Sequence, residues 1–286
     1  MELKSAIMLR VLINRFHQGA PEVLLKGLSK EEAEHVLVHT ISSTEASKVM
    51  TKPSAFLKDI HYSWLQPVLE TFRSSLQPML ISALPTDSAV PLSKLMCHPL
   101  LKPASDVSRE FLLSSLCRKF MESSPLPVTF LPETFASPLA LLNKTQLIEL
   151  IDFLGIYDLA EELRHIVDKV LLKAIYKCLS LKKQHFLRIC LHQKEKLKAV
   201  KIGLINWKGD EVQLGRLLHR RGLLRLSYAL SGQSSDLMWH IIHRLDVGRG
   251  QIIKKNYSKK EVPGVTVYLS LQVLNTFNYL KKMSGT

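Results

Sequence analysis

The 286-residue chain has few of the features that mark catalytic or membrane-spanning proteins. It contains no Walker A loop and no HExxH, GxSxG or GxGxxG motif. No apolar run approaches the ~20 residues that a membrane-spanning helix needs. Lys4, Arg10 and Arg15 interrupt the apolar N-terminal stretch, which argues against a signal peptide. We therefore expect a cytoplasmic protein that is not an enzyme.

Cysteine is also scarce, and its spacing differs from that of the common zinc and redox motifs. The four cysteines are Cys97, Cys117, Cys178 and Cys190. They form no CxxC pair and no metal-type set with histidines. We expect buried thiols in a reducing compartment, with no metal and no cofactor.

Acidic residues are outnumbered, so the chain is strongly basic. It has 25 Asp and Glu against 39 Lys and Arg, a formal net charge of +14. Between Lys177 and Lys201, eight Lys or Arg face a single acid, Glu195. A charge of this size predicts an acidic partner, which could be nucleic acid, an anionic membrane surface or a protein. Charge alone does not choose among the three.

What the sequence has in abundance is helical periodicity. Hydrophobic residues recur at helical spacing along almost the whole chain, which predicts an all-α fold. The segment Ser29-Lys30-Glu31-Glu32 is a capping box that begins a helix, and Ser105 or Asp106 can cap another. A further helix opens near Thr145, and we expect Gly155 to end it.

Prolines should keep several helices short. Pro53, Pro67 and Pro78 lie along the apolar stretch before Leu84, and we expect a break at each of them. Residues Val265–Met283 are predicted to form a closing helix, although Val-Thr-Val-Tyr within them is locally typical of a strand.

A proline-rich segment suggests where the chain divides. Four prolines fall between Ser123 and Pro138, where hydrophobic periodicity is weak, and we interpret this segment as a linker. The predicted organisation is an N-terminal helical domain over residues 1–122, the linker over 123–138, a helical segment over 139–200 and a C-terminal helical domain over 201–286.

A weak internal repeat suggests that the helices stack. Segments 24–29, 80–85 and 226–231 each finish an apolar helix with a small residue, a leucine and a capping or turn residue. Such units bury their apolar faces only against stacked neighbours. We expect stacked short helices in an armadillo-like arrangement. The alternative, that helix corners share this pattern by chance, stays open.

The order of residues 209–260 resembles the C-terminal domain of the flagellar switch protein FliG. Without gaps, Asp210-Glu211 fall on the family's two consecutive acids, and Arg216 falls on its basic position. Leu217-Leu218 fall on its paired leucines. Ala229-Leu230 with Gly232 fall on the Ala-Leu-x-Gly corner of that family.

The match continues into the next helix, where Leu237 and Ile241-Ile242 fall on core positions. Residues Pro21 to Leu37 look similar to the armadillo-like repeat of the FliG middle region. The resemblance therefore implies a right-handed superhelical stack of short helices with a C-terminal helical domain.

Two departures from the family pattern bear on function. The family's hinge motif before the C-terminal domain is replaced by Val200-Lys201-Ile202-Gly203, which argues against a switching motion there. His219, Arg220, Arg221 and Arg225 make the later part of the charged helix positive throughout, which favours a static acidic partner over a rotating contact.

The resemblance implies a non-enzymatic scaffold that is cytoplasmic and peripheral to the inner membrane. It would form a homo-oligomeric ring in a flagellum-related type III secretion apparatus or a flagellar switch. It would join membrane-ring proteins to cytoplasmic-ring proteins, with an anionic membrane surface as a further partner. The residues expected to contact partners are Asp210, Glu211, Arg216, Arg220 and Arg221.

The alternative function is a nucleic-acid-binding regulator. Residues Asp236 to Lys255 predict two short helices around a turn, the second rich in Arg and Lys, which is typical of a DNA-reading helix–turn–helix. Its basic residues could neutralise phosphates. Against it, Gly248 and Gly250 would lie inside the second helix, and helix pairing in a packed domain gives the same pattern.

Overall fold

The computed structural model describes residues 3–17, 20–38, 53–102, 104–120, 125–193, 197, 202–204, 207–283 and 285. Their regular structure is entirely helical, with no strand in these ranges, so the predicted all-α class is confirmed. None of the described helices is both long and apolar enough to cross a membrane. The superhelical, armadillo-like arrangement stays a prediction.

The chain forms two compact units, residues 1–132 and 133–286. The boundary falls inside the segment 123–138 that the sequence marks as a linker. The expected border between residues 200 and 201 lies within the second unit. Each unit is described by itself.

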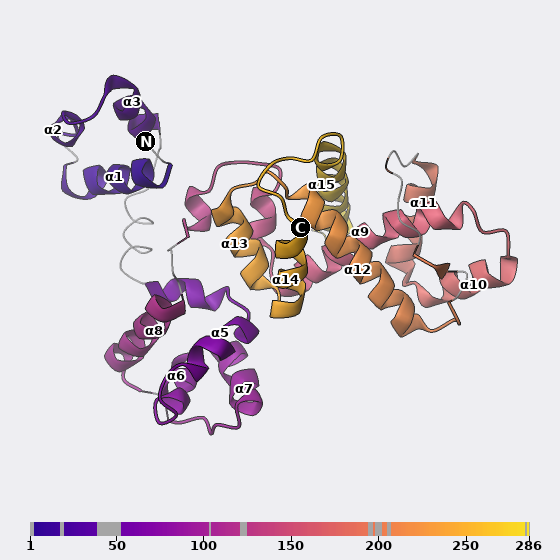
Figure 1. Ribbon diagram of the computed structural model, residues 1–286, viewed down its shortest axis with the longest axis horizontal. Coiled ribbons are helices and arrows are strands. Elements are labelled where there is room, and N and C mark those ends of the chain that lie inside the picture. The colour runs from indigo at the N-terminus through magenta and orange to yellow at the C-terminus, as the bar shows by residue number, and fades with distance from the viewer. Residues whose placement is uncertain are drawn as a thin grey trace. The chain divides into compact units, whose positions relative to one another are not determined.

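The helices of the first unit are short (Figure 1). They are α1 (Leu3–Phe16), α2 (Glu22–Leu25), α3 (Lys30–Val38), η1 (Pro53–Lys58), α5 (Tyr62–Glu70), α6 (Gln77–Ala83), α7 (Thr86–Leu95), α8 (Asp106–Phe120) and η2 (Val128–Phe130).

The capping box before α3 has the expected geometry. Ser29 Oγ accepts from the Glu32 amide at 3.3 Å, and the Ser29 amide donates to Glu32 Oε2 at 3.3 Å. The Ser29 amide and the Ser29 hydroxyl both donate to the Glu32 carboxylate and hold its pKa below the usual value. Ser105 Oγ likewise accepts from the Ser108 amide at 3.3 Å, at the start of α8.

The prolines behave differently from one another. Pro78 lies in the first turn of α6 and Pro53 begins η1, as expected of helix starts. The break expected at Pro67 is wrong, because α5 continues through it to Glu70. In a nine-residue helix, this proline removes one internal donor, and the apolar face that buries Leu65 and Leu69 holds the helix together.

The second unit is built around one buried helix, α9 (Lys144–Leu163), of which twelve of twenty residues are buried. Its other helices are η3 (Ser137–Leu141), α10 (Lys169–Cys178), α11 (Leu181–His192), α12 (Glu211–Ala229), α13 (Ser235–Arg244), α14 (Val247–Asn256) and α15 (Thr266–Met283). Helices α11, α12 and α15 pack against α9. The predicted closing helix is confirmed as α15.

Gly155 does not end α9, so that expectation is wrong. It lies within the helix, where the backbone of α12 crosses so closely that a Cβ on Gly155 would come within 2.1 Å of the Leu218 carbonyl oxygen. Gly222 of α12 is the counterpart, because its Cβ would meet the Ile151 carbonyl oxygen at 1.7 Å. The glycine is needed for contact between two backbones and not for a turn.

The three repeat segments all occur at helix ends. Segment 24–29 joins α2 to α3, segment 80–85 joins α6 to α7, and segment 226–231 ends α12. Leu84 and Leu230 are the C-cap residues of α6 and α12, and both are buried.

None of the four cysteines forms a disulfide, and their burial differs. Cys117 and Cys190 are buried as expected, whereas Cys97 is exposed and Cys178 is half-buried. The expectation of four buried thiols is therefore wrong for these two. Desolvation and the nearby Glu110 carboxylate raise the pKa of Cys117 to about 11.

Candidate interaction surface on helix α12

Helix α12 begins with the two acids that the sequence marks as partner contacts. The Asp210 carboxylate caps the helix, since Oδ1 accepts from the Val212 amide at 2.9 Å. The Asp210 carbonyl oxygen accepts from Trp207 Nε1 at 2.8 Å. Glu211 is exposed in the first turn, where a negative charge complements the helix dipole.

The arginines of α12 point in two directions. Arg216 and Arg220 are four residues apart on the exposed face of the helix. Arg221 is turned inward, and its Nε donates to Asp158 Oδ2 of α9 at 2.5 Å. Of the predicted contact residues, Glu211, Arg216 and Arg220 are thus free to meet a partner, while Asp210 and Arg221 have structural roles.

Asp158 and Arg225 form the centre of a buried polar cluster that the sequence did not indicate. Arg225 Nε donates to Asp158 Oδ1 at 3.0 Å, and its Nη1 donates to Gln272 Oε1 of α15. Asp158 is 2% exposed and Arg225 6%. The Arg225 guanidinium lies 5.5 Å from the Tyr157 ring centre. The cluster ties α9, α12 and α15 together, because a buried charge needs partners.

A second polar chain joins four helices through His219. Its Nε2 accepts from Arg249 Nε of α14 at 2.7 Å, so its Nδ1 carries the proton and donates to Asp152 Oδ1 of α9 at 2.7 Å. Lys183 of α11 donates to the other oxygen of Asp152 at 3.0 Å. Burial raises the Asp152 pKa, but the His219 hydrogen bond and the Lys183 charge outweigh it and lower the pKa overall.

An aspartate–histidine pair of this kind is found in nucleophilic enzymes, where the second ring nitrogen activates a hydroxyl or thiol. Here an arginine occupies that nitrogen, and an arginine cannot give up its proton in a protein. His219 is therefore held as a structural acceptor, and the pair does not have the arrangement of a catalytic base.

The basic residues of the proposed DNA-reading segment are largely engaged. Helices α13 and α14 are joined by Leu245 and Asp246. Arg244 donates to the Ala140 and Leu142 carbonyl oxygens, each at 2.5 Å, and Arg249 pairs with Asp246 and His219. Of the basic residues expected to reach phosphates, Lys254 and Lys255 are exposed.

The segment that leads into α12 is clamped to α9. The Glu162 carboxylate accepts from the amides of Gly203 at 3.1 Å and Leu204 at 2.7 Å, and from that of Ile202. Gly203 has a φ of +89°, which glycine adopts without strain. Residues 200 and 201, which stand where the FliG family has its hinge motif, lie outside the described residues. The charged Glu162 carboxylate thus accepts three backbone hydrogen bonds and holds residues 202–204 against α9.

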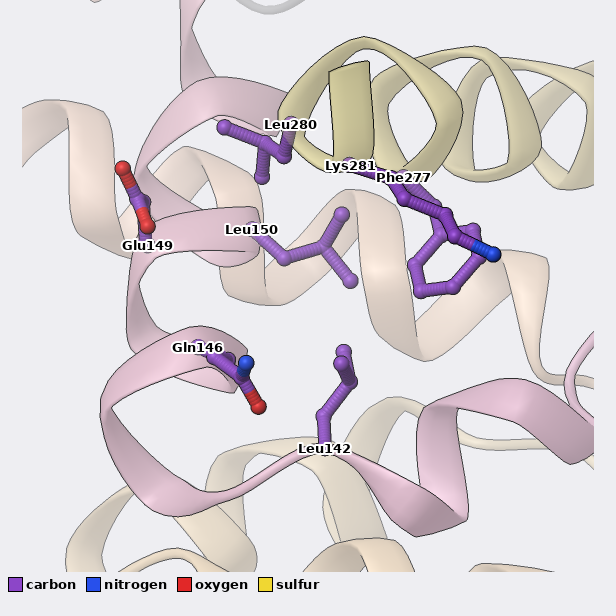
Figure 2. A pocket seen from close by; sticks show the side chains of 7 residues that line it. All are labelled: Leu142, Gln146, Glu149, Leu150, Phe277, Leu280 and Lys281. Carbon is purple, nitrogen blue, oxygen red and sulfur yellow. The ribbon is translucent and has the colours of Figure 1, made fainter. Parts of the chain in front are cut away.

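A pocket of about 210 Å³ lies between the start of α9 and the end of α15. Its lining residues are Leu142, Gln146, Glu149, Leu150, Phe277, Leu280 and Lys281. Figure 2 shows the leucines and Phe277 around the hollow, with Gln146 and Glu149 on one side and Lys281 near the phenyl ring. The lining can hold a small apolar group and shows no nucleophile paired with a base.

No protein-family model matches this chain, and neither a curated protein sequence nor a solved structure matches it. The resemblance to FliG therefore stays a prediction from the sequence, made from residues 209–260 and from Pro21 to Leu37.

Proposed function

We propose that the chain is a FliG-like scaffold subunit without enzymatic activity. It would build a ring in a flagellum-related type III secretion apparatus or a flagellar switch, at the cytoplasmic face of the inner membrane. It would join membrane-ring proteins to cytoplasmic sorting or switch proteins.

One observation carries the proposal: the residues shared with the FliG pattern have distinct structural roles around α12. Asp210 is its N-cap, Leu218 is buried, and Leu230 is its C-cap. Gly232 has a φ of +82° at the corner, and its amide donates to the Ser258 carbonyl oxygen at 3.0 Å. These residues occupy the helix start, a core position and a left-handed corner that the pattern requires, and this agreement supports the proposal.

The contact surface that follows is the exposed face of α12. Glu211 begins it, and Arg216 and Arg220 continue it with two positive charges. Arginine is enriched in protein interfaces because its planar guanidinium binds carboxylates with two parallel hydrogen bonds. The favoured partner is a protein surface that presents acids to both arginines.

Affinity capture with charge-reversed variants tests this function. Arg216→Glu with Arg220→Glu should lose membrane-ring or secretion-platform proteins that the wild-type chain recovers. The matched control is Lys254→Glu with Lys255→Glu, which reverses two exposed charges on α14 and should recover the same proteins. Equal recovery by both variants would refute the assignment of the α12 surface. A wild-type chain that captures no such protein would refute the proposed function.

The nucleic-acid alternative is favoured by the uneven charge. Residues 133–286 hold 25 of the 39 Lys and Arg and 13 of the 25 Asp and Glu, a net charge of +12. If it holds, duplex binding would be sub-micromolar with a steep salt dependence. Lys254→Glu with Lys255→Glu would weaken binding, and the α12 variant would have the smaller effect.

A further inference from the structure

Helices α10 and α11 carry positive charge and contain no acidic residue of their own. From Lys169 to His192 there are six Lys or Arg and no Asp or Glu. Figure 1 shows this helical pair at one end of the second unit, away from α13 and α14. The charge here is therefore separate from the helices of the nucleic-acid alternative.

Most of these cations have no partner among the residues that the structure describes. Lys183 is bound to Asp152. The side chains of Lys169, Lys173, Lys177 and Lys182 are exposed and make no hydrogen bond or ion pair with any residue that the structure describes. Four ammonium groups thus remain for an external anion.

Three aliphatic side chains on or beside these helices are largely exposed. Val167 is 91% exposed, Val170 77% and Leu181 82%. Ile175 is the one residue of α10 that is fully buried. Covering exposed apolar side chains of this size with an apolar phase is favourable, so they can add to binding that the lysines begin.

The two kinds of side chain share one face of α10. At about 100° per residue, Lys169, Val170, Lys173 and Lys177 fall within a ~100° arc, and all four are exposed. Val167 lies just before this helix, and Leu181 begins α11 two residues after it ends. Lys169, Val170, Lys173 and Lys177 form the lysine-rich surface that is here called the α10 face, and the exposed Val167 and Leu181 lie close to its two ends in the sequence.

We propose that the α10 face binds the surface of an anionic lipid bilayer, with α10 lying in the plane of the interface. In this position the lysines interact with the anionic headgroups. The aliphatic side chains enter the boundary between the headgroups and the acyl chains. Single-stranded nucleic acid is bound largely by exposed aromatic side chains, and the aromatic residue of α10, Tyr176, is half-buried.

This inference deepens the proposed function, because a scaffold at the inner membrane would use such a face to orient itself. It does not depend on the partner surface of α12. If vesicle binding fails while capture by α12 persists, the lipid inference alone falls. If α12 capture fails while vesicle binding persists, the scaffold proposal alone falls.

Vesicle sedimentation with the full chain tests the inference. Vesicles of phosphatidylcholine alone should not retain the protein, whereas vesicles with 30% phosphatidylglycerol should retain it, and added salt should release it. Lys173→Glu with Lys177→Glu should lower the partition coefficient by about 25-fold or more, from a loss of at least about fivefold for each lysine. Val170→Ser, which keeps every charge, should lower it about threefold or more.

The matched control is Lys259→Glu with Lys260→Glu, which reverses two exposed charges between α14 and α15 and should change binding less than threefold. Circular dichroism and melting temperatures of all variants should match the wild type. Equal binding to both vesicle compositions, or equal losses in the α10 and control variants, would overturn the inference. Tighter binding to duplex DNA than to the anionic vesicles, lost in the α10 variant, would also overturn it in favour of nucleic acid.

Discussion

Gly222 determines how closely α12 can approach α9. A methyl group there would lie 1.7 Å from a backbone oxygen of Ile151, which no side-chain rearrangement can relieve. Gly222→Ala should therefore lower the free energy of unfolding by ~3 kcal/mol or more, measured by urea denaturation. Gly215→Ala is the matched control in the same helix, where open space surrounds the new methyl group. It should stabilise the protein by ~0.5–1 kcal/mol.

Asp158 neutralises two inward-facing arginines, so its charge should matter more than its volume. Asp158→Asn keeps the shape but leaves Arg221 and Arg225 without their carboxylate, and should cost ~3–5 kcal/mol of stability. Asp210→Asn makes the same chemical change at an exposed N-cap, where asparagine caps as well as aspartate. Similar losses in the two variants would show that the cluster does not depend on the Asp158 charge.

Thiol reactivity should separate the cysteines by their surroundings. Cys97 is exposed, whereas Cys117 is buried with a pKa of about 11. Because the thiolate is the reactive form, an alkylating reagent at pH 8 should modify Cys97 first. Cys117 should react only after denaturation. Peptide mass spectrometry of timed samples distinguishes the two, and early modification of Cys117 would contradict its burial.

Single residues also show where sequence reasoning reaches its limit. Arg220 and Arg221 are indistinguishable by type, yet one is exposed and the other pairs with an aspartate 63 positions away. A helical turn of ~100° per residue separates them, but which of the two faces inward depends on α9. The sequence therefore predicted the charged helix correctly and could not separate its internal contacts from its exposed ones.

Among the helices, α14 depends on ionised carboxyl groups at its attachment points. Asp246 caps it and pairs with Arg249, which also bonds His219 beside Asp152. Burial raises the pKa of both carboxyls, but their hydrogen bonds and nearby cations lower it overall. A folded pKa below the unfolded value of ~3.9 adds stability above that pH and loses it as the pH falls through the folded pKa.

The contribution of these two carboxyls to the melting temperature should therefore stay level from pH 7 to about 4.5 and be lost below about 4. Burial lowers the pKa of His243, so this histidine should add a separate decline that begins near its unfolded value of about 6.5. Asp246→Asn keeps a capping side chain but loses the ion pair, so it should lower the melting temperature at pH 7 and flatten the decline in acid. An unchanged acid profile in this variant would assign the decline to other carboxyls, such as Asp152.

Helix starts were predictable because capping is local. The capping bonds join residues three positions apart, Ser29 with Glu32 and Ser105 with Ser108. Both partners of each bond therefore lie within one short stretch of sequence. Helix ends were less predictable. Gly155 has the identity of a terminator but lies within α9, because the backbone that excludes a side chain there belongs to α12. Information of that kind is not present within a short window of sequence.

At the scale of the whole molecule, charge is divided unequally between the two units. Residues 133–286 carry +12 of the formal charge, whereas residues 1–132 carry 14 Lys or Arg against 12 Asp or Glu. Expressed as separate fragments, the second should bind a cation exchanger at pH 7 and elute at much higher salt than the first. It should also unfold cooperatively, because α9 supplies it with its own core. Non-cooperative melting of that fragment would show that the units depend on each other.

The paired glycines of α9 and α12 also offer a way to recognise distant relatives. Surface charges such as those of Arg216 and Arg220 can change with each new partner, and a chain that has lost them would show little overall similarity. Where the backbones of α9 and α12 touch, such substitutions are not tolerated, because the positions of Gly155 and Gly222 leave no room for a side chain. A sequence search that requires two glycines in predicted helices, separated along the chain as Gly155 and Gly222 are, should therefore find distant homologues that surface residues no longer identify.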